Sequence, residues 1–138
     1  MTYVCPVLSV SPAKEDHKAL RQLLADAPWL IRESHSIRSA VMVLEECRIP
    51  VLVCDRDLSP GTWKDLLEQL AMLSSAPFVV VSSRQADDDL WTDALTAGAY
   101  DVLAKPFNAS ELKRTLLEAA QHWHEQYESA PLTRAVGA

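Results

Sequence analysis

Short runs of apolar residues alternate along this chain with longer segments in which apolar residues recur at helical spacing. The runs at residues 51–54 and 78–81 contain no charged residue, as expected of strands that are buried on both faces of a parallel sheet. Further strands are expected at residues 7–10, 29–31 and 102–104. Because each strand is followed by a helical pattern, right-handed crossovers should join the strands. We therefore predict an α/β fold with a doubly wound, five-stranded parallel sheet and helices on both faces.

Local signals set the expected ends of the helices and of the folded domain. Ser11 and Pro12 suit the N-cap and the first position of the first helix. Residues 108–111, Asn-Ala-Ser-Glu, have the pattern of a capping box. A chain of 138 residues has the size of one compact domain, and its helical period is lost near the C-terminus. We expect one folded domain at residues 4–125 and a flexible C-terminal tail at residues 126–138.

Composition excludes several classes of protein. The 19 acidic residues outnumber the 13 Lys and Arg residues, and this net charge of −6 argues against binding to nucleic acid. The three glycines lie far apart, which excludes the glycine-rich loops that bind dinucleotides or nucleoside triphosphates. The three cysteines share no CxxC spacing, as expected of reduced thiols. The sequence has neither an apolar stretch of roughly 18 residues nor the basic start of a signal peptide, so we expect a cytoplasmic protein with no membrane partner.

Polar residues follow the predicted strands at the points where those strands end. Asp55 follows the third strand, Ser82 the fourth and Lys105 the fifth. Ligands of such sheets bind beyond the carboxyl ends of the strands, so these three side chains should converge there. A carboxylate nucleophile, an ammonium that offsets phosphoryl charge and a hydroxyl donor together suit phosphoryl chemistry.

Over about residues 4–125 the chain resembles the receiver domains of bacterial two-component response regulators. The matching stretches are residues 51–61, 79–83 and 98–107, the last of which has Gly-Ala before the strand and Lys-Pro-Phe after it. The resemblance implies a flavodoxin-like receiver fold, a histidine-kinase phosphodonor and a magnesium ion. It also implies that Asp55 is the phospho-acceptor, Ser82 the switch hydroxyl and Lys105 the conserved-type lysine of the site. Such a domain is a phospho-accepting signalling protein and not an enzyme.

The sequence departs from the family pattern at the metal site. The family usually has two adjacent carboxylates directly after the first strand, whereas this chain has Ser11 and Pro12 there. Glu15 and Asp16 follow about one helical turn later, which places them too far away to ligate directly. The expected metal ligands are therefore the Asp55 carboxylate and a backbone carbonyl near Asp57. Because Mg²⁺ depends on carboxylate oxygens, we predict weak Mg²⁺ binding.

Two other functions stay open. One is a pseudo-receiver, an interaction module that does not depend on phosphorylation, which the replacement of the acidic pair favours. The other is a phosphatase similar to the haloacid dehalogenases, because Asp55-Arg56-Asp57-Leu58-Ser59 resembles the nucleophile loop of that family. In that family the first Asp is the nucleophile and the second is a general acid and base.

The resemblance also suggests partners. We expect a single-domain regulator that receives phosphate from a histidine kinase or a phosphotransfer protein and acts on an unknown downstream protein. A homodimer through the fourth and last helices is a further expectation. The side chains of Asp57 and Arg84 are expected to attract one another beside the acceptor. The four histidines (His17, His35, His122 and His124) are expected to be solvated side chains that do not form a metal site.

Overall fold

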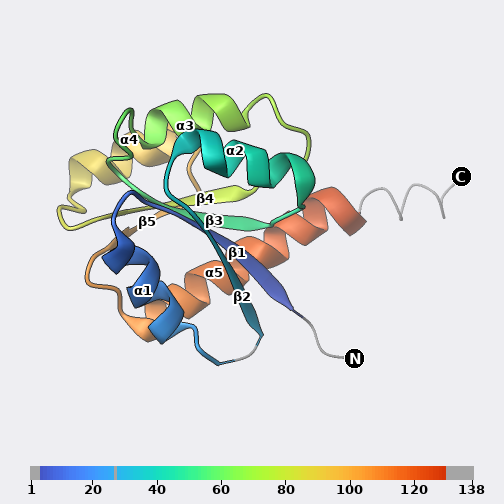
Figure 1. Ribbon diagram of the computed structural model, residues 1–138, viewed down its shortest axis with the longest axis horizontal. Helices are drawn as coiled ribbons and strands as arrows, with labels where there is room; N and C mark the ends of the chain where they lie inside the picture. Colours follow the sequence, from blue (N-terminus) through green and yellow to red (C-terminus); the bar gives the residue numbers. More distant parts are fainter. Residues whose placement is uncertain (1–3, 27, 130–138) are drawn as a thin grey trace, which may run out of the picture.

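The computed structural model describes residues 4–26 and 28–129. Five strands alternate with five α-helices, and a short π-helix follows (Figure 1). The elements are β1 (Cys5–Val10), α1 (Lys14–Leu23), β2 (Trp29–Ser34), α2 (Ile37–Glu46), β3 (Val51–Asp55), α3 (Trp63–Leu70), β4 (Phe78–Ser83), α4 (Asp88–Ala97), β5 (Asp101–Ala104), α5 (Ala109–His124) and the π-helix Glu125–Ser129.

All strands are parallel and follow the order β2-β1-β3-β4-β5 in one sheet. Helices α1 and α5 cover one face of the sheet, and α2, α3 and α4 cover the other (Figure 1). From β1 the chain runs first to β2 on one side of it, and then to β3, β4 and β5 on the other side. The crevice between β1 and β3 therefore lies at a topological switch point. The predicted doubly wound sheet with helices on both faces is confirmed.

Two apolar cores hold the layers together. Leu52 and Cys54 of β3 belong to the core under α2, α3 and α4, whereas Val51 and Val53 belong to the core under α1 and α5. Successive side chains of a strand point to opposite faces of the sheet, so a continuous apolar run feeds both cores. This is why the uninterrupted run at residues 51–54 forms the centre of the sheet.

The ends of several elements differ from the sequence expectation, most clearly those of β2 and α1. Strand β2 extends to Ser34 instead of ending near residue 31, because it pairs with β1 along its whole length. The expectation that the first helix begins at Pro12 is wrong. Helix α1 begins at Lys14, and its N-cap residue Ala13 makes no side-chain cap.

The end of the chain is helical where the structure describes it. The π-helix Glu125–Ser129 continues directly from α5, and the ring of Tyr127 lies 5.5 Å from that of Trp123. Residues 126–129 of the expected tail are therefore helical, and residues 130–138 lie outside the described residues. In the part of the chain that the structure describes, no helix combines the length and apolar character needed to cross a bilayer.

Candidate functional site

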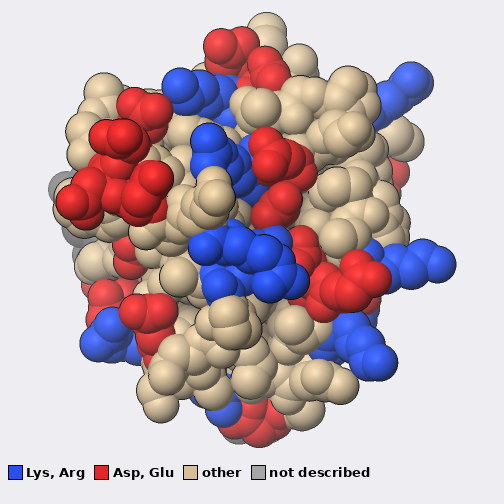
Figure 2. Space-filling view, turned by 90° about the vertical axis from the view of Figure 1, so that its left-hand side faces the viewer, with Lys and Arg blue, Asp and Glu red and all other residues tan. Residues whose placement is uncertain are grey.

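Asp55, Ser82 and Lys105 lie at one edge of the sheet, as the sequence predicts. Asp55 is the last residue of β3 and pairs in register with Ser82 of β4. Lys105 follows β5 directly. This edge belongs to the face shown in Figure 2, where acidic and basic side chains lie intermingled. The parallel register alone is sufficient to place these residues side by side.

The ammonium of Lys105 is the centre of the site. Its Nζ lies 2.6 Å from Asp55 Oδ1, and 3.0 and 2.9 Å from Asp16 Oδ1 and Oδ2. The three side chains are only 11 to 18 % exposed. An ammonium has three protons to donate, and these three contacts use all of them. Lys105 therefore links two carboxylates that would otherwise repel one another.

The same contacts keep Lys105 charged. Burial by itself lowers the pKa of this ammonium, but the hydrogen bonds to Asp55 and Asp16 outweigh burial and raise the pKa above its ordinary value. The site therefore holds one fixed positive charge between two carboxylates at neutral pH. Such a charge can stabilise the negative oxygens of a transferring phosphoryl group.

Asp16 is the site residue that sequence reasoning placed too far away. Its Oδ2 accepts a hydrogen bond of 2.6 Å from the hydroxyl of Ser11, and that hydroxyl also accepts the backbone N–H of Ala13. Because α1 begins at Lys14 and not at Pro12, Asp16 lies in the first turn of the helix. Three residues separate the end of β1 from the start of α1, and this start places the first turn of the helix beside the sheet edge. Knowledge of that helix start would have identified Asp16.

Ser82 is buried beside Asp55 but does not bond to it. Its hydroxyl donates a hydrogen bond of 3.2 Å to the carbonyl of Cys54, and the residue is 3 % exposed. A small cavity reaches Ser82, Asp55, Asp16 and Ser11. Ser82 thus lines the same space as Asp55 and Asp16.

Asp57 contributes its backbone to the site. Its N–H donates a hydrogen bond of 3.3 Å to Asp55 Oδ2, while its own carboxylate is exposed. The loop is anchored by Leu58, which is fully buried. The expected attraction between Asp57 and Arg84 is not formed as an ion pair within the described residues, and both side chains are exposed.

The donor set of this edge is compatible with a hard divalent cation. Asp16 and Asp55 bring two carboxylates within reach of one ammonium, and Mg²⁺ usually takes one or two carboxylates with water and a backbone oxygen. The ligands expected from the sequence were only Asp55 and a backbone carbonyl near Asp57. The structure adds the carboxylate of Asp16 to the oxygen atoms that could hold the ion.

The histidines differ in their surroundings. The expectation that all four are solvated is wrong for His17, which is 2 % exposed and contacts Ser9 and Ser11. His122 lies beside the hydroxyl of Tyr100, and its side chain is exposed. His17 also lies close to Glu33 of β2 and to His35, which follows that strand.

Comparison with known proteins identifies a family for most of the chain. The sequence profile of the response regulator receiver domain matches residues 7–117. The KDP operon transcriptional regulatory protein KdpE of Escherichia coli K12 is 27 % identical over an alignment of 124 residues, and the match covers 87 % of this chain. The match covers 55 % of KdpE, so the chain spans about half the length of that relative.

Solved structures agree with this assignment. The signal receiver domain of a LuxO repressor protein from Vibrio parahaemolyticus superposes with a TM-score of 0.81 at 22 % identity, covering 90 % of this chain and 95 % of that one. The receiver domain of Ssk1, solved in complex with the histidine phosphotransfer protein Ypd1 of Saccharomyces cerevisiae, gives 0.75 at 17 % identity, covering 87 % and 91 %. At such identities the likeness establishes the fold.

Proposed function

The chain belongs to the response regulator receiver domain family of two-component signalling, and we propose that Asp55 is the residue on which it accepts a phosphoryl group. The observation that carries this proposal is the Lys105 ammonium, 2.6 Å from Asp55 Oδ1 at the end of β3. A carboxylate at the carboxyl edge of a parallel sheet, beside a fixed cation, has the position and the charge environment of a phosphoryl acceptor. The family match makes the alternative haloacid-dehalogenase-like phosphatase untenable.

The transfer is a displacement at phosphorus. One carboxylate oxygen of Asp55 forms a bond to the phosphorus of a phosphohistidine while the phosphorus–nitrogen bond breaks. The electron pair of that bond stays on the imidazole nitrogen, which takes up a proton from solvent. Lys105 offsets the negative charge that gathers on the phosphoryl oxygens.

The Ser82 hydroxyl would respond to phosphorylation by exchanging its present hydrogen bond for one to the phosphoryl group. Its hydroxyl donates to the Cys54 carbonyl while Asp55 is unmodified. A phosphoryl group on Asp55 offers negatively charged oxygens, which are stronger acceptors than a carbonyl. We expect the hydroxyl to turn to one of them, and this movement would report phosphorylation to the adjoining loop.

In this proposal, the Asp16 carboxylate replaces the two adjacent carboxylates that the family usually has after the first strand. When Mg²⁺ is bound, it would offset the charges of the acceptor and of the incoming phosphoryl group. Asp16 and Asp55 are the carboxylates that would hold it, together with the backbone carbonyl near Asp57. Because Lys105 already bonds to both carboxylates, the ion competes with a built-in cation, and binding weaker than in receivers with the adjacent acidic pair is expected.

The proposed partner is a histidine-containing phosphodonor, either a histidine kinase or a phosphotransfer protein. The receiver domain of Ssk1, which shares this fold, was solved with the phosphotransfer protein Ypd1. Downstream, the proposal is contact with a further protein. Helices α4 and α5, on which a homodimer was expected, carry the half-exposed apolar side chains of Trp91 and Leu117, and such side chains suit a protein interface.

A second candidate function is a pseudo-receiver that binds partners without phosphorylation. The observation that favours it is the arrangement of charges at the site, in which the Lys105 ammonium bonds to the carboxylates of both Asp16 and Asp55. Ser11 and Pro12 in place of two carboxylates point in the same direction. The two functions share a fold and differ in whether Asp55 reacts.

The deciding experiment is the intact mass of the chain after incubation with a small phosphodonor and a high concentration of Mg²⁺. Phosphorylation adds the mass of one phosphoryl group to the wild type. Asp55→Asn should abolish the addition. Asp57→Asn is the matched control, because it changes a carboxylate two residues away that points to solvent, and it should leave the addition intact.

The same mass measurement distinguishes the phosphorylated receiver from the pseudo-receiver. A wild type that stays unmodified at every Mg²⁺ concentration, although it is folded by circular dichroism, would establish the pseudo-receiver. An addition that survives in Asp55→Asn would place the acceptor elsewhere and refute the proposal.

A further inference from the structure

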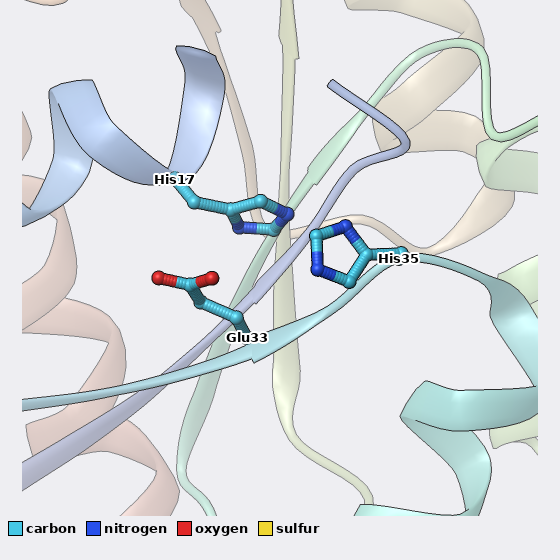
Figure 3. A group of neighbouring side chains, drawn as sticks. All are labelled: His17, Glu33 and His35. Atoms are coloured by element: carbon cyan, nitrogen blue, oxygen red, sulfur yellow. The ribbon is translucent and has the colours of Figure 1, made fainter. Parts of the chain in front are cut away.

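Three potential metal ligands meet between α1 and β2. His17 comes from α1, Glu33 lies in β2, and His35 follows the end of that strand. One ligand atom from each lies within 4.8 Å of the other two. Figure 3 shows the three side chains pointing toward one another across the gap between the helix and the strand. Glu33 is the last but one residue of β2 and His35 is the first residue after it.

Two of the three ligands have unused lone pairs. His35 makes no hydrogen bond with any residue that the structure describes, and its only ring contact is with His17, at a centroid distance of 4.8 Å. Glu33 Oε2 accepts a hydrogen bond from Arg21, whereas Oε1 has no partner among the described residues. The exposed members of the cluster therefore need no rearrangement of the fold in order to coordinate an ion.

His17 is oriented by the backbone. Its Nε2 lies 2.9 Å from the carbonyl oxygen of Ser11, and because a carbonyl can only accept, Nε2 carries the proton. Nδ1 then holds the lone pair, which meets the hydroxyl of Ser9 at 2.8 Å. A ring nitrogen that donates to a backbone carbonyl is the usual support of a metal-bound histidine. An ion has only the rotatable Ser9 hydroxyl to displace.

The chemistry of the donors selects the metal. Two imidazoles and one carboxylate are a known ligand set of zinc sites that leave one position to water. Mg²⁺ and Ca²⁺ prefer oxygen ligands. Lys14, Lys18 and Arg21 also line the open cavity beside the cluster, and their positive charge opposes an ion that is held by electrostatic attraction alone. Coordination by nitrogen is less dependent on such attraction.

We propose that His17, Glu33 and His35 form a Zn²⁺ site with three protein ligands and one water. A bound ion would tie the start of α1 to the edge strand β2. The site is separate from phosphoryl transfer to Asp55 and stands whether or not that transfer occurs.

The test is a Zn²⁺ titration of the full chain without an affinity tag, in competition with a chromophoric chelator and with the thiols kept reduced. The wild type should bind one Zn²⁺ per chain. His35→Gln and Glu33→Gln should each weaken binding by more than about tenfold, because three protein ligands become two. Both positions are exposed, so neither variant should impair folding. His122→Gln, which removes an exposed histidine elsewhere, is the matched control and should bind as the wild type does.

Two further readouts make the result unambiguous. Zn²⁺ should raise the melting temperature of the wild type and of His122→Gln but not that of His35→Gln, since an ion stabilises only the fold that binds it. Arg21→Gln should tighten binding, because it frees Glu33 and removes a positive charge. No Zn²⁺ binding by the wild type, or equal binding by His35→Gln and His122→Gln, would overturn the proposal.

Discussion

Asp16→Asn tests whether one carboxylate in the first turn of α1 takes the place of the missing acidic pair. The amide keeps the size and shape of the side chain and can still accept the hydroxyl of Ser11. What it removes is one negative charge, at 2.9 and 3.0 Å from the Lys105 ammonium. The substitution therefore isolates the electrostatic contribution of Asp16 from its packing.

The size of the effect follows from the burial of the pair. The side chains of Asp16 and Lys105 are 16 % and 11 % exposed, so solvent screens them less than it screens a surface pair. A hydrogen bond to a charged group contributes about 1.5–3 kcal/mol, and a neutral one about 1 kcal/mol. Replacing the carboxylate by an amide should thus lower the free energy of unfolding by about 1–2 kcal/mol. For a chain of this size that corresponds to a fall in melting temperature of about 3–8 °C.

The assay is thermal unfolding followed by circular dichroism, with and without Mg²⁺, and the matched control is Glu15→Gln. Glu15 is the neighbouring acidic residue of the same helical turn, is exposed and has no ion-pair partner within the described residues. Its substitution shares the loss of charge near the helix N-terminus, so the difference between the two variants reports the contact with Lys105.

Mg²⁺ provides the second measurement. Asp16→Asn should weaken Mg²⁺ binding by about tenfold or more, equivalent to about 1.4 kcal/mol, whereas Glu15→Gln should not change it. If both variants melt at the same temperature and bind Mg²⁺ equally, Asp16 does not replace the acidic pair, and the reasoning from its contacts fails.

Further predictions concern backbone strain and the cysteines. Gly98→Ala should cost about 1 kcal/mol by chemical denaturation, because φ is +104° but nothing lies within 4 Å of the added Cβ. Gly61→Ala should cost more, because at φ +91° its Cβ would lie 2.9 Å from Asp65 Oδ2, which caps α3; equal costs would contradict this. Iodoacetamide should modify the half-buried Cys47 long before the buried Cys54 in folded protein, as peptide mass analysis would show. Burial raises the pKa of the Cys54 thiol, so the free energy of unfolding should fall as the pH rises above about 9, where only the unfolded thiol ionises; a flat alkaline profile would argue against it.

The sheet could be predicted from the sequence because its signal is local. The run at residues 51–54 has no charged residue, which is typical of a strand covered on both faces. Once the strands are located, their parallel arrangement brings every carboxyl end to one edge. Asp55, Ser82 and Lys105 were therefore identified as neighbours without knowledge of any side-chain contact. Their proposed roles in phosphoryl transfer remain predictions.

Residues contributed by helices could not be placed in this way. The direction of a helical side chain depends on where the helix begins and how it packs on the sheet, and the first of these was misjudged by two residues for α1. That difference decides whether Asp16 points away from Lys105 or bonds to it. His17 is affected in the same way, since its burial against Ser9 and Ser11 follows from the packing of α1 on β1.

The sequence by itself therefore determined the order of strands along the chain, the two-faced burial of the sheet and the edge at which its polar residues gather. Only the tertiary structure decided that Asp16 shares Lys105 with Asp55, and that His17, Glu33 and His35 meet between α1 and β2. The physical reason is the range of the interactions. The period of the apolar residues and the ends of the strands depend on residues that are neighbours in the sequence. The two clusters instead join side chains of separate elements, and the packing of the whole core sets the relative position of those elements.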